Sequence, residues 1–234
     1  MFVRLSASLL ACTALVTAAD IRGTITIVRK LTRYNVTASA GIYQRGLPVD
    51  LGDDPAKDPI AFELSHVAVY LEGVPDGAAS RPLEATIEQK NRRFVPDLVV
   101  IPAGSTISFP NSDPVFHNVF SLSKTKSFDL GNYPKGKTQT IKFTEAGVVA
   151  VYCHLHPNME ASIVVAPNRW VTRAASDGRF ALTDVPAGSY TVVAWHRITG
   201  AFRKKVDIAP GGSADIQFVL PYVEPSAAKT IAHR

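Results

Sequence analysis

Apolar residues in this chain recur in short runs, many of which alternate with polar residues. A period of two is typical of strands that bury one face, whereas the wider spacing of an amphipathic helix is nearly absent. Turn-forming clusters such as Pro102-Ala103-Gly104 separate the runs. Strands are predicted at residues 23–28, 66–71, 85–88, 98–101, 106–109, 138–143, 148–152, 162–165, 180–182, 190–195 and 216–220. The pattern predicts an all-β, sandwich-like fold.

Two changes of composition divide the chain. Residues 73–84 are rich in Gly, Pro, Ala and Ser and are predicted to be a linker, and a second break falls near Pro167. Residues 223–234 lack an apolar pattern and are predicted to be a flexible tail. Residues 31–60 form a long, mostly polar connection, for which two alternatives stay open: an unrecognised strand or an ordered functional loop.

The N-terminus, residues 1–19, is typical of a secretory signal peptide. Arg4 gives a positive start, a short apolar stretch follows, and small residues precede a predicted cleavage site before Asp20. The surroundings of Cys12 also resemble a lipoprotein signal, but the apolar stretch continues beyond this cysteine, which favours ordinary cleavage. No other apolar run approaches the ~20 residues of a membrane-spanning helix. We therefore expect a soluble protein without a membrane span, periplasmic or otherwise exported.

The composition is that of a globular chain, with 46% hydrophobic and 19% charged residues, and the formal net charge is +5. Basic residues are scattered, without the aromatic interleaving or long basic helix of a nucleic-acid-binding protein. Two interpretations of this charge stay open. It belongs to solvated faces that aid solubility, which is the preferred interpretation, or it steers the protein toward an acidic partner.

One loop concentrates the residue types that bind soft metals. Cys153, His156 and Met159 follow a C-x2-H-x2-M pattern, and His154 lies between them. Once residues 1–19 are removed, Cys153 is the single remaining cysteine, so it has no intramolecular disulfide partner in an oxidising compartment. A lone exported thiol beside two histidines is best interpreted as a metal ligand.

A fourth ligand has to come from another part of the chain. His117 lies on a predicted strand that a sandwich can place beside the Cys153 loop. One thiolate, two imidazoles and a thioether form a soft donor set, and two His and one Cys with a weak axial Met are typical of blue-copper sites. Zinc also accepts Cys and His, but Met is an unusual zinc ligand. The residue types therefore favour one copper ion per chain.

Residues 85–166 resemble the cupredoxin family, and within it the amicyanin and plastocyanin-like proteins. The resemblance rests on the length of the C-x2-H-x2-M loop, on Pro157 directly after the second His, and on the flanking stretches 100–109 and 144–147. It implies a cupredoxin Greek-key β-sandwich with a mononuclear type 1 (blue) copper site.

The resemblance also implies roles for single residues. His117, Cys153 and His156 correspond to the equatorial ligands and Met159 to the axial one. Asn118 corresponds to a residue that connects the two ligand loops by hydrogen bonds. His154 departs from the amicyanin pattern and leaves two alternatives, a second metal or a surface or packing role. The second is preferred, because alternation along a strand points His154 away from the metal of Cys153.

The C-terminal part of the chain, residues 167–222, resembles a second family of β-sandwiches, the transthyretin-like or carboxypeptidase-regulatory modules. The stretch SDGRFALTDVPAGSYTVVAWH carries the resemblance, with a DG turn and a P-x-G turn between strands. The early strands of such a module are expected within residues 20–84, which makes residues 85–166 an insertion in a split sandwich. Exported methylamine-utilisation-type proteins share this layout. His66 and His196 are assigned to structure, and His233 receives no role.

A metal with four protein ligands has no vacant position for a substrate, so an enzyme is not expected. The predicted function is the transfer of single electrons between redox protein partners. One alternative is a copper-binding module for metal trafficking or sensing, without stable Cu(II). A third hypothesis is a structural sandwich that binds no metal.

Overall fold

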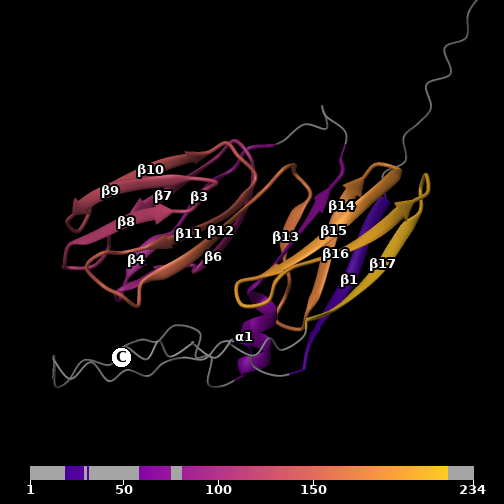
Figure 1. Ribbon diagram of the computed structural model, residues 1–234, viewed down its shortest axis with the longest axis horizontal. Helices are drawn as coiled ribbons and strands as arrows, with labels where there is room; N and C mark the ends of the chain where they lie inside the picture. The colour runs from indigo at the N-terminus through magenta and orange to yellow at the C-terminus, as the bar shows by residue number, and fades with distance from the viewer. Residues whose placement is uncertain (1–18, 29–30, 32–57, 75–80, 221–234) are drawn as a thin grey trace, which may run out of the picture.

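The computed structural model describes residues 19–28, 31, 58–74 and 81–220. Two β-sandwiches lie side by side (Figure 1). The all-β prediction is confirmed in its coarser form, since the described residues form strands and a single short helix. No helix in these ranges is long and apolar enough to cross a membrane. The predicted signal peptide (apart from Ala19), most of residues 31–60, the tail and His233 lie outside the described residues.

The first sandwich is built from residues 84–166. Its strands are β3 (Glu84–Thr86), β4 (Glu88–Lys90), β5 (Arg93–Val95), β6 (Leu98–Pro102), β7 (Ser105–Pro110), β8 (His117–Leu122), β9 (Ser127–Tyr133), β10 (Thr138–Phe143), β11 (Gly147–Tyr152) and β12 (Glu160–Ala166). One sheet has the order β10-β7-β3 and the other β6-β12-β11-β8-β9, while β4 and β5 form a separate hairpin. Alternate residues of β7 are buried, and they pack against β11 and β12 in one apolar core.

The second sandwich combines the start of the described chain with its end. Its strands are β1 (Ala19–Ile27), β2 (Val67–Glu72), β13 (Val171–Arg173), β14 (Arg179–Val185), β15 (Gly188–His196), β16 (Gly200–Ile208) and β17 (Ser213–Leu220). The sheets have the orders β14-β1-β17 and β13-β2-β15-β16. Strand β1 pairs in parallel with β17, which joins the start of the described chain to its end. The residues of the first sandwich are inserted in the sequence between β2 and β13.

A short helix, α1 (Pro59–Ser65), precedes β2. It begins where the Asp58 carboxylate accepts hydrogen bonds from the main-chain N–H groups of Ile60 and Ala61 at 3.1 and 2.9 Å. His66 terminates the helix as its C-cap, and β2 begins one residue later. The prediction that His66 lies in a strand was therefore wrong. The conformation of His66 is set by its position as the C-cap of α1, and the pattern of apolar residues in the sequence does not reveal such a cap.

The two sandwiches contact each other through the faces of two sheets. Ala68 on β2, Leu98 on β6 and Val164 on β12 are buried at this contact, and Trp195 of β15 packs against them. On β12, Val164 points toward the second sandwich while its neighbours Ile163 and Val165 belong to the core of the first. Both faces of this strand are therefore buried.

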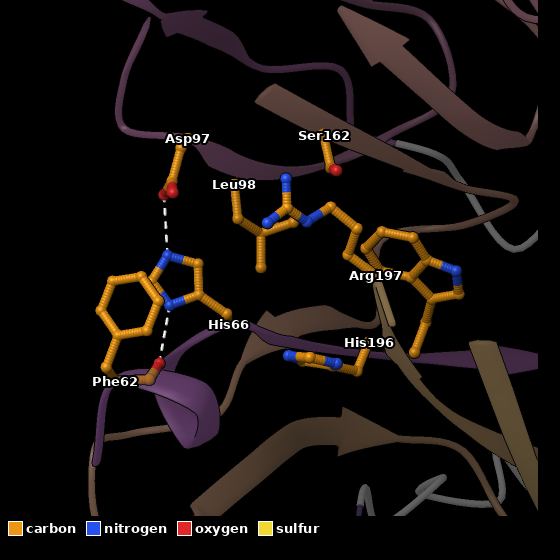
Figure 2. Close-up of a pocket in the computed structure, with 8 residues that line it drawn as sticks. Phe62, His66, Asp97, Leu98, Ser162, His196 and Arg197 are labelled. Atoms are coloured by element: carbon orange, nitrogen blue, oxygen red, sulfur yellow. Dashed lines mark hydrogen bonds and ion pairs between the residues drawn. The ribbon is translucent and has the colours of Figure 1, made fainter. Parts of the chain in front are cut away.

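An imidazole connects the two sandwiches at the edge of this contact (Figure 2). The Nδ1 atom of His66 lies 2.7 Å from the carbonyl oxygen of Phe62, and its Nε2 atom lies 2.7 Å from Oδ1 of Asp97. Both partners are acceptors, so both ring nitrogens carry protons. Burial by itself lowers the pKa of His66, but the hydrogen bond and charge of Asp97 outweigh burial and raise this pKa above its ordinary 6.5.

We expect this ion pair to stabilise the protein over a limited pH range. Burial alone raises the pKa of Asp97, but the bond to His66 outweighs it, so the pKa lies below 3.8. The contribution of His66 is complete below pH 6.5 and is lost as the pH rises through its raised pKa. The contribution of Asp97 is complete above pH 3.8 and is lost as the pH falls through its lowered pKa.

The variant Asp97→Asn should therefore unfold more easily than the parent chiefly between about pH 4 and 6.5. The loss should stay below about 1 kcal/mol, because the Asp97 side chain is 48% exposed and its charge is screened. Thermal unfolding measured across this pH range checks the prediction, with Asp215→Asn, a change at an exposed position of β17, as a control. A difference between Asp97→Asn and the parent that does not change with pH would contradict it.

Candidate metal centre

The predicted metal ligands are brought together by antiparallel pairing of β8 and β11, where Tyr152 lies opposite Phe120. In such a pair, the start of one strand lies near the end of the other. His117 is the first residue of β8, and Cys153 directly follows β11. The sequence-predicted pair therefore meets at one end of the first sandwich.

Three side chains converge at this end. The ligand atoms of His117, Cys153 and His156 all lie within 4.8 Å of one another. The Nδ1 atoms of the two imidazoles are 3.0 Å apart, and the Cys153 sulfur is 3.7 Å from the Nδ1 atom of His156. Within the described ranges, no other group of three His, Cys, Asp or Glu side chains comes this close.

The cluster is buried on one side and accessible on the other. His117 is fully buried and Cys153 is 5% exposed, whereas His156 is partly exposed. Met159 is 1% exposed and belongs to the same apolar cluster as Cys153, and its main-chain N–H donates to the His156 carbonyl at 3.0 Å. This turn closes the loop that carries the three predicted ligands.

The far side of the His117 ring is held by a carboxylate that the sequence analysis missed. The Nε2 atom of His117 lies 2.7 Å from Oδ2 of Asp113. An ionised carboxylate only accepts, so Nε2 carries a proton and donates to Asp113, and Nδ1 is the ring nitrogen that faces Cys153 and His156. The spacing of Asp113 four residues before His117 was the available signal, but it becomes meaningful only once the loop between them is folded.

Asp113 is itself held by a tight turn. The main-chain N–H groups of Asn91 and Arg92 donate to its two oxygens at 2.7 and 2.8 Å. Asn91 and Arg92 have φ values of 54° and 56°, the left-handed conformation that a two-residue hairpin loop requires. Burial alone raises the pKa of Asp113, but these bonds and the bond to His117 outweigh it and lower the pKa.

The loop between β7 and β8 is fixed by Asn111, which is 1% exposed. Its side-chain N–H groups donate to the carbonyls of Val115 and Tyr133 at 2.9 and 3.0 Å, and its side-chain oxygen accepts from the N–H of Asp113 at 2.9 Å. These bonds hold Asp113 in place without any contribution from a bound metal. The ligand geometry is therefore largely preorganised.

Asn118 connects the two ligand loops. Its main-chain N–H points at the Cys153 sulfur at 3.4 Å, and its side-chain oxygen accepts from the N–H of His154 at 3.4 Å. Its side-chain nitrogen donates to Asp129 at 2.6 Å. A hydrogen bond to a thiolate withdraws charge from the sulfur, which is one means by which proteins tune copper sites.

His154 lies outside the cluster. Its ring stacks on Phe120 with centroids 3.6 Å apart and planes at 6°, and its Nε2 atom is 3.7 Å from a carboxylate oxygen of Asp129. The His154 side chain is 55% exposed. These contacts give it a packing role on the surface of the sheet.

The donor set fits copper. One sulfur and two imidazole Nδ1 atoms point to a common position, and a buried thioether lies in the adjoining core. Burial first, then the charges of His117 and Arg92, lower the pKa of His156. A neutral imidazole keeps its lone pair available for a metal.

Comparisons with known proteins give matches to solved structures alone, since no family model and no curated protein matches the chain. A purple cupredoxin from Nitrosopumilus maritimus is 27% identical over 35% of this chain and 98% of its own, with a TM-score of 0.32. Amicyanin from Paracoccus versutus is 25% identical over 40% of this chain and 85% of its own, with a TM-score of 0.33.

A copper-containing nitrite reductase from Thermus scotoductus SA-01 is 27% identical over 40% of this chain, with a TM-score of 0.34. The match spans only 25% of that enzyme. Because all these TM-scores are low, the similarity supports no conclusion about function. Such a conclusion depends on the geometry of the candidate metal centre.

Replacing Asp113 by Asn should weaken copper binding by about 10- to 100-fold, because the His117 ring loses the acceptor that fixes its orientation. Asn has nearly the same volume, so the fold is expected to persist, which circular dichroism verifies. Competition for copper with a chelator of known affinity measures the effect. The variant Asp215→Asn serves as the control, and equal affinities of both variants would contradict the prediction.

Replacing His154 by Ala should leave the copper content at one ion per chain, because its ring packs on Phe120 outside the cluster. Metal analysis of the purified variant beside the parent checks this. The loss of a second copper equivalent would show that His154 binds metal.

Proposed function

We propose that this chain is an exported type 1 copper protein that carries single electrons between redox protein partners. His117, Cys153 and His156 would be the equatorial ligands and Met159 the axial ligand. The observation that carries the proposal is the convergence of one thiol sulfur and two imidazole nitrogens within 4.8 Å at a largely buried end of a β-sandwich. This donor set is typical of blue-copper sites.

Copper bound there supplies one redox-active centre that alternates between Cu(I) and Cu(II). The chain holds the donor atoms nearly fixed, through Asp113 on His117 and Asn118 on Cys153. A fixed environment lowers the reorganisation that accompanies the change of charge. Burial of Cys153 and His117 also excludes water from these two proposed ligands. Such a centre favours electron exchange over chemistry on a bound substrate.

The route for electrons to a partner would run through His156, the ligand that is partly exposed. Phe116 and Leu155 are 55% and 45% exposed beside the ligand loops, and Pro114 and Pro157 are exposed as well. Pro114 and Phe116 precede His117, and Leu155 and Pro157 flank His156, whose ring lies 4.7 Å from that of His117, so we assign these four residues to one apolar surface, which we call the apolar centre. Exposed apolar side chains gathered at one place mark interaction sites.

The second sandwich has a supporting role in this proposal, as a carboxypeptidase-regulatory-like module. Its Arg197 forms an ion pair with Glu160, the residue after Met159, and Arg173 donates to the carbonyl of Leu98 at 3.4 Å. These contacts brace the start of β12 and β6. The module contributes none of the proposed ligands.

Visible and electron paramagnetic resonance spectra of the Cu(II)-loaded protein test the proposal, beside Cys153→Ala. We expect an intense thiolate-to-copper absorption band and a narrow copper hyperfine splitting, both lost in the variant. Ser121→Ala, a buried substitution on β8, is the control for a change that leaves the ligands intact. Immediate bleaching to Cu(I) would instead indicate copper trafficking. A weak spectrum that is the same in the parent and in Cys153→Ala would contradict the type 1 assignment.

A further inference from the structure

Basic side chains gather at the end of the first sandwich that holds the metal centre. The hairpin of β4 and β5 carries Lys90 and Arg93 at its strand ends and Arg92 in its turn, and the turn between β9 and β10 carries Lys135 and Lys137. All five residues are exposed. We call them the basic rim. Their position, and not the overall charge, is what links them to the metal centre.

The first of the two turns is tied directly to a proposed ligand. Asp113 accepts hydrogen bonds from the N–H groups of Asn91 and Arg92, and the same carboxylate holds the ring of His117. The turn is therefore fixed relative to the metal centre.

The second turn is attached to the loop that carries part of the apolar centre. The N–H of Gly136 donates to the carbonyl of Asn111 at 2.7 Å, and the N–H of Asn111 donates to the carbonyl of Lys137 at 2.9 Å. Asn111 also holds Val115, the neighbour of exposed Phe116. Both basic turns thus adjoin the loops around His156.

Two carboxylates lie close to these turns, and a third, Asp129, lies beside the ligand loop, where it accepts from Asn118 and faces His154. Asp113 is buried beneath His117, and Glu88 is bonded to the hydroxyl of Ser112. They are outnumbered by the five cations of the basic rim, so this end of the sandwich keeps an excess of positive charge. Charges arranged around an apolar centre favour an oppositely charged partner and accelerate its encounter.

We infer that the basic rim and the apolar centre together dock an acidic protein, whose carboxylates surround an apolar patch of its own. This inference rests on the proposed function and names the class of partner. A protein fits better than a membrane, because the apolar centre lies on short loops fixed by hydrogen bonds and the described residues offer no amphipathic helix at this end. Transient docking at His156 is what an electron carrier requires.

The first test uses the metal-free protein and fluorescently labelled poly(L-glutamate). At about 20 mM salt, Lys90→Gln/Arg92→Gln should bind this probe about five-fold more weakly than the parent, and the difference should vanish near 0.5 M salt. The double variant Lys135→Gln/Lys137→Gln should show the same weaker binding and the same salt dependence. The matched control is Lys124→Gln/Lys142→Gln, which removes two exposed charges beyond the end of β8 and near the end of β10, away from the metal centre.

Equal weakening in rim and control variants would overturn the inference, since net charge alone would then explain binding. Rim-dependent binding to phosphatidylglycerol vesicles with none to poly(L-glutamate) would overturn it in favour of a membrane. Retained binding by the control with loss in both rim variants supports it.

The second test uses the reduced, copper-loaded protein and two oxidants of opposite charge. One electron passes from Cu(I), which becomes Cu(II), to hexacyanoferrate(III) or to tris(phenanthroline)cobalt(III). The rim variants should slow the reaction with the anionic oxidant about five-fold and should not slow the cationic one. If electrons pass to both oxidants at rates that the rim variants leave unchanged, the inference fails and the proposed function stands. If neither oxidant reacts while the metal-free protein still binds poly(L-glutamate) through the rim, the proposed function fails and the docking surface stands.

Discussion

The candidate metal centre depends on the register between two antiparallel strands, β8 and β11. Their pairing brings Asn118 within 3.4 Å of the Cys153 sulfur across 35 positions of sequence. In a sheet, a shift of one residue moves every side chain to the opposite face. Such a shift would turn His117 out of the core and leave the thiol without its imidazole partner. The apolar core formed by Val119, Val149 and Val151 opposes that shift, because these three residues are fully buried, whereas the residues that would replace them, such as Phe120 and Ala150, are only partly buried in this register.

A second layer of hydrogen bonds converts this proximity into a defined geometry. Asp113 orients the ring of His117, Asn111 holds the loop that carries Asp113, and the left-handed turn at Asn91 and Arg92 completes the support. Each of these bonds uses main-chain or buried side-chain groups that would otherwise lack partners. The same carboxylate therefore links the proposed ligand His117 to the turn that carries part of the basic rim.

The second sandwich is joined to the first through the outer face of β6 and β12 and through the pair of His66 and Asp97. This contact involves the sheet and not the loops that hold His117 and His156. Buried Val164 and Leu98 exclude water from it, while the imidazole of His66 bridges helix α1 and the start of β6. The two sandwiches are therefore held together by a buried apolar contact and by one ion pair at its edge.

The sequence by itself determined much of the buried framework. Alternation identified the strands that bury one face, such as β7, because burial imposes a period of two on the residues themselves. It missed β9 and β16, which lie at sheet edges and expose most of their residues, so that only a few partly buried apolar residues, such as Phe128 and Leu130 in β9, mark them. The grouping of Cys153, His156 and Met159 was visible because ligands within one loop are close in any fold.

Tertiary structure decided what depends on distant contacts. It brought His117 to Cys153, and it placed Asp113 behind the imidazole in a way that no local spacing reveals. His66 appeared to be part of a strand, but capping of α1 and the carboxylate of Asp97 gave it another conformation and a charge. In the sequence, the residues of the basic rim are scattered lysines and arginines. In the fold, two turns bring them to the loop between β7 and β8. Composition records which groups are present, whereas their effect depends on distance, and distance is a property of the folded chain.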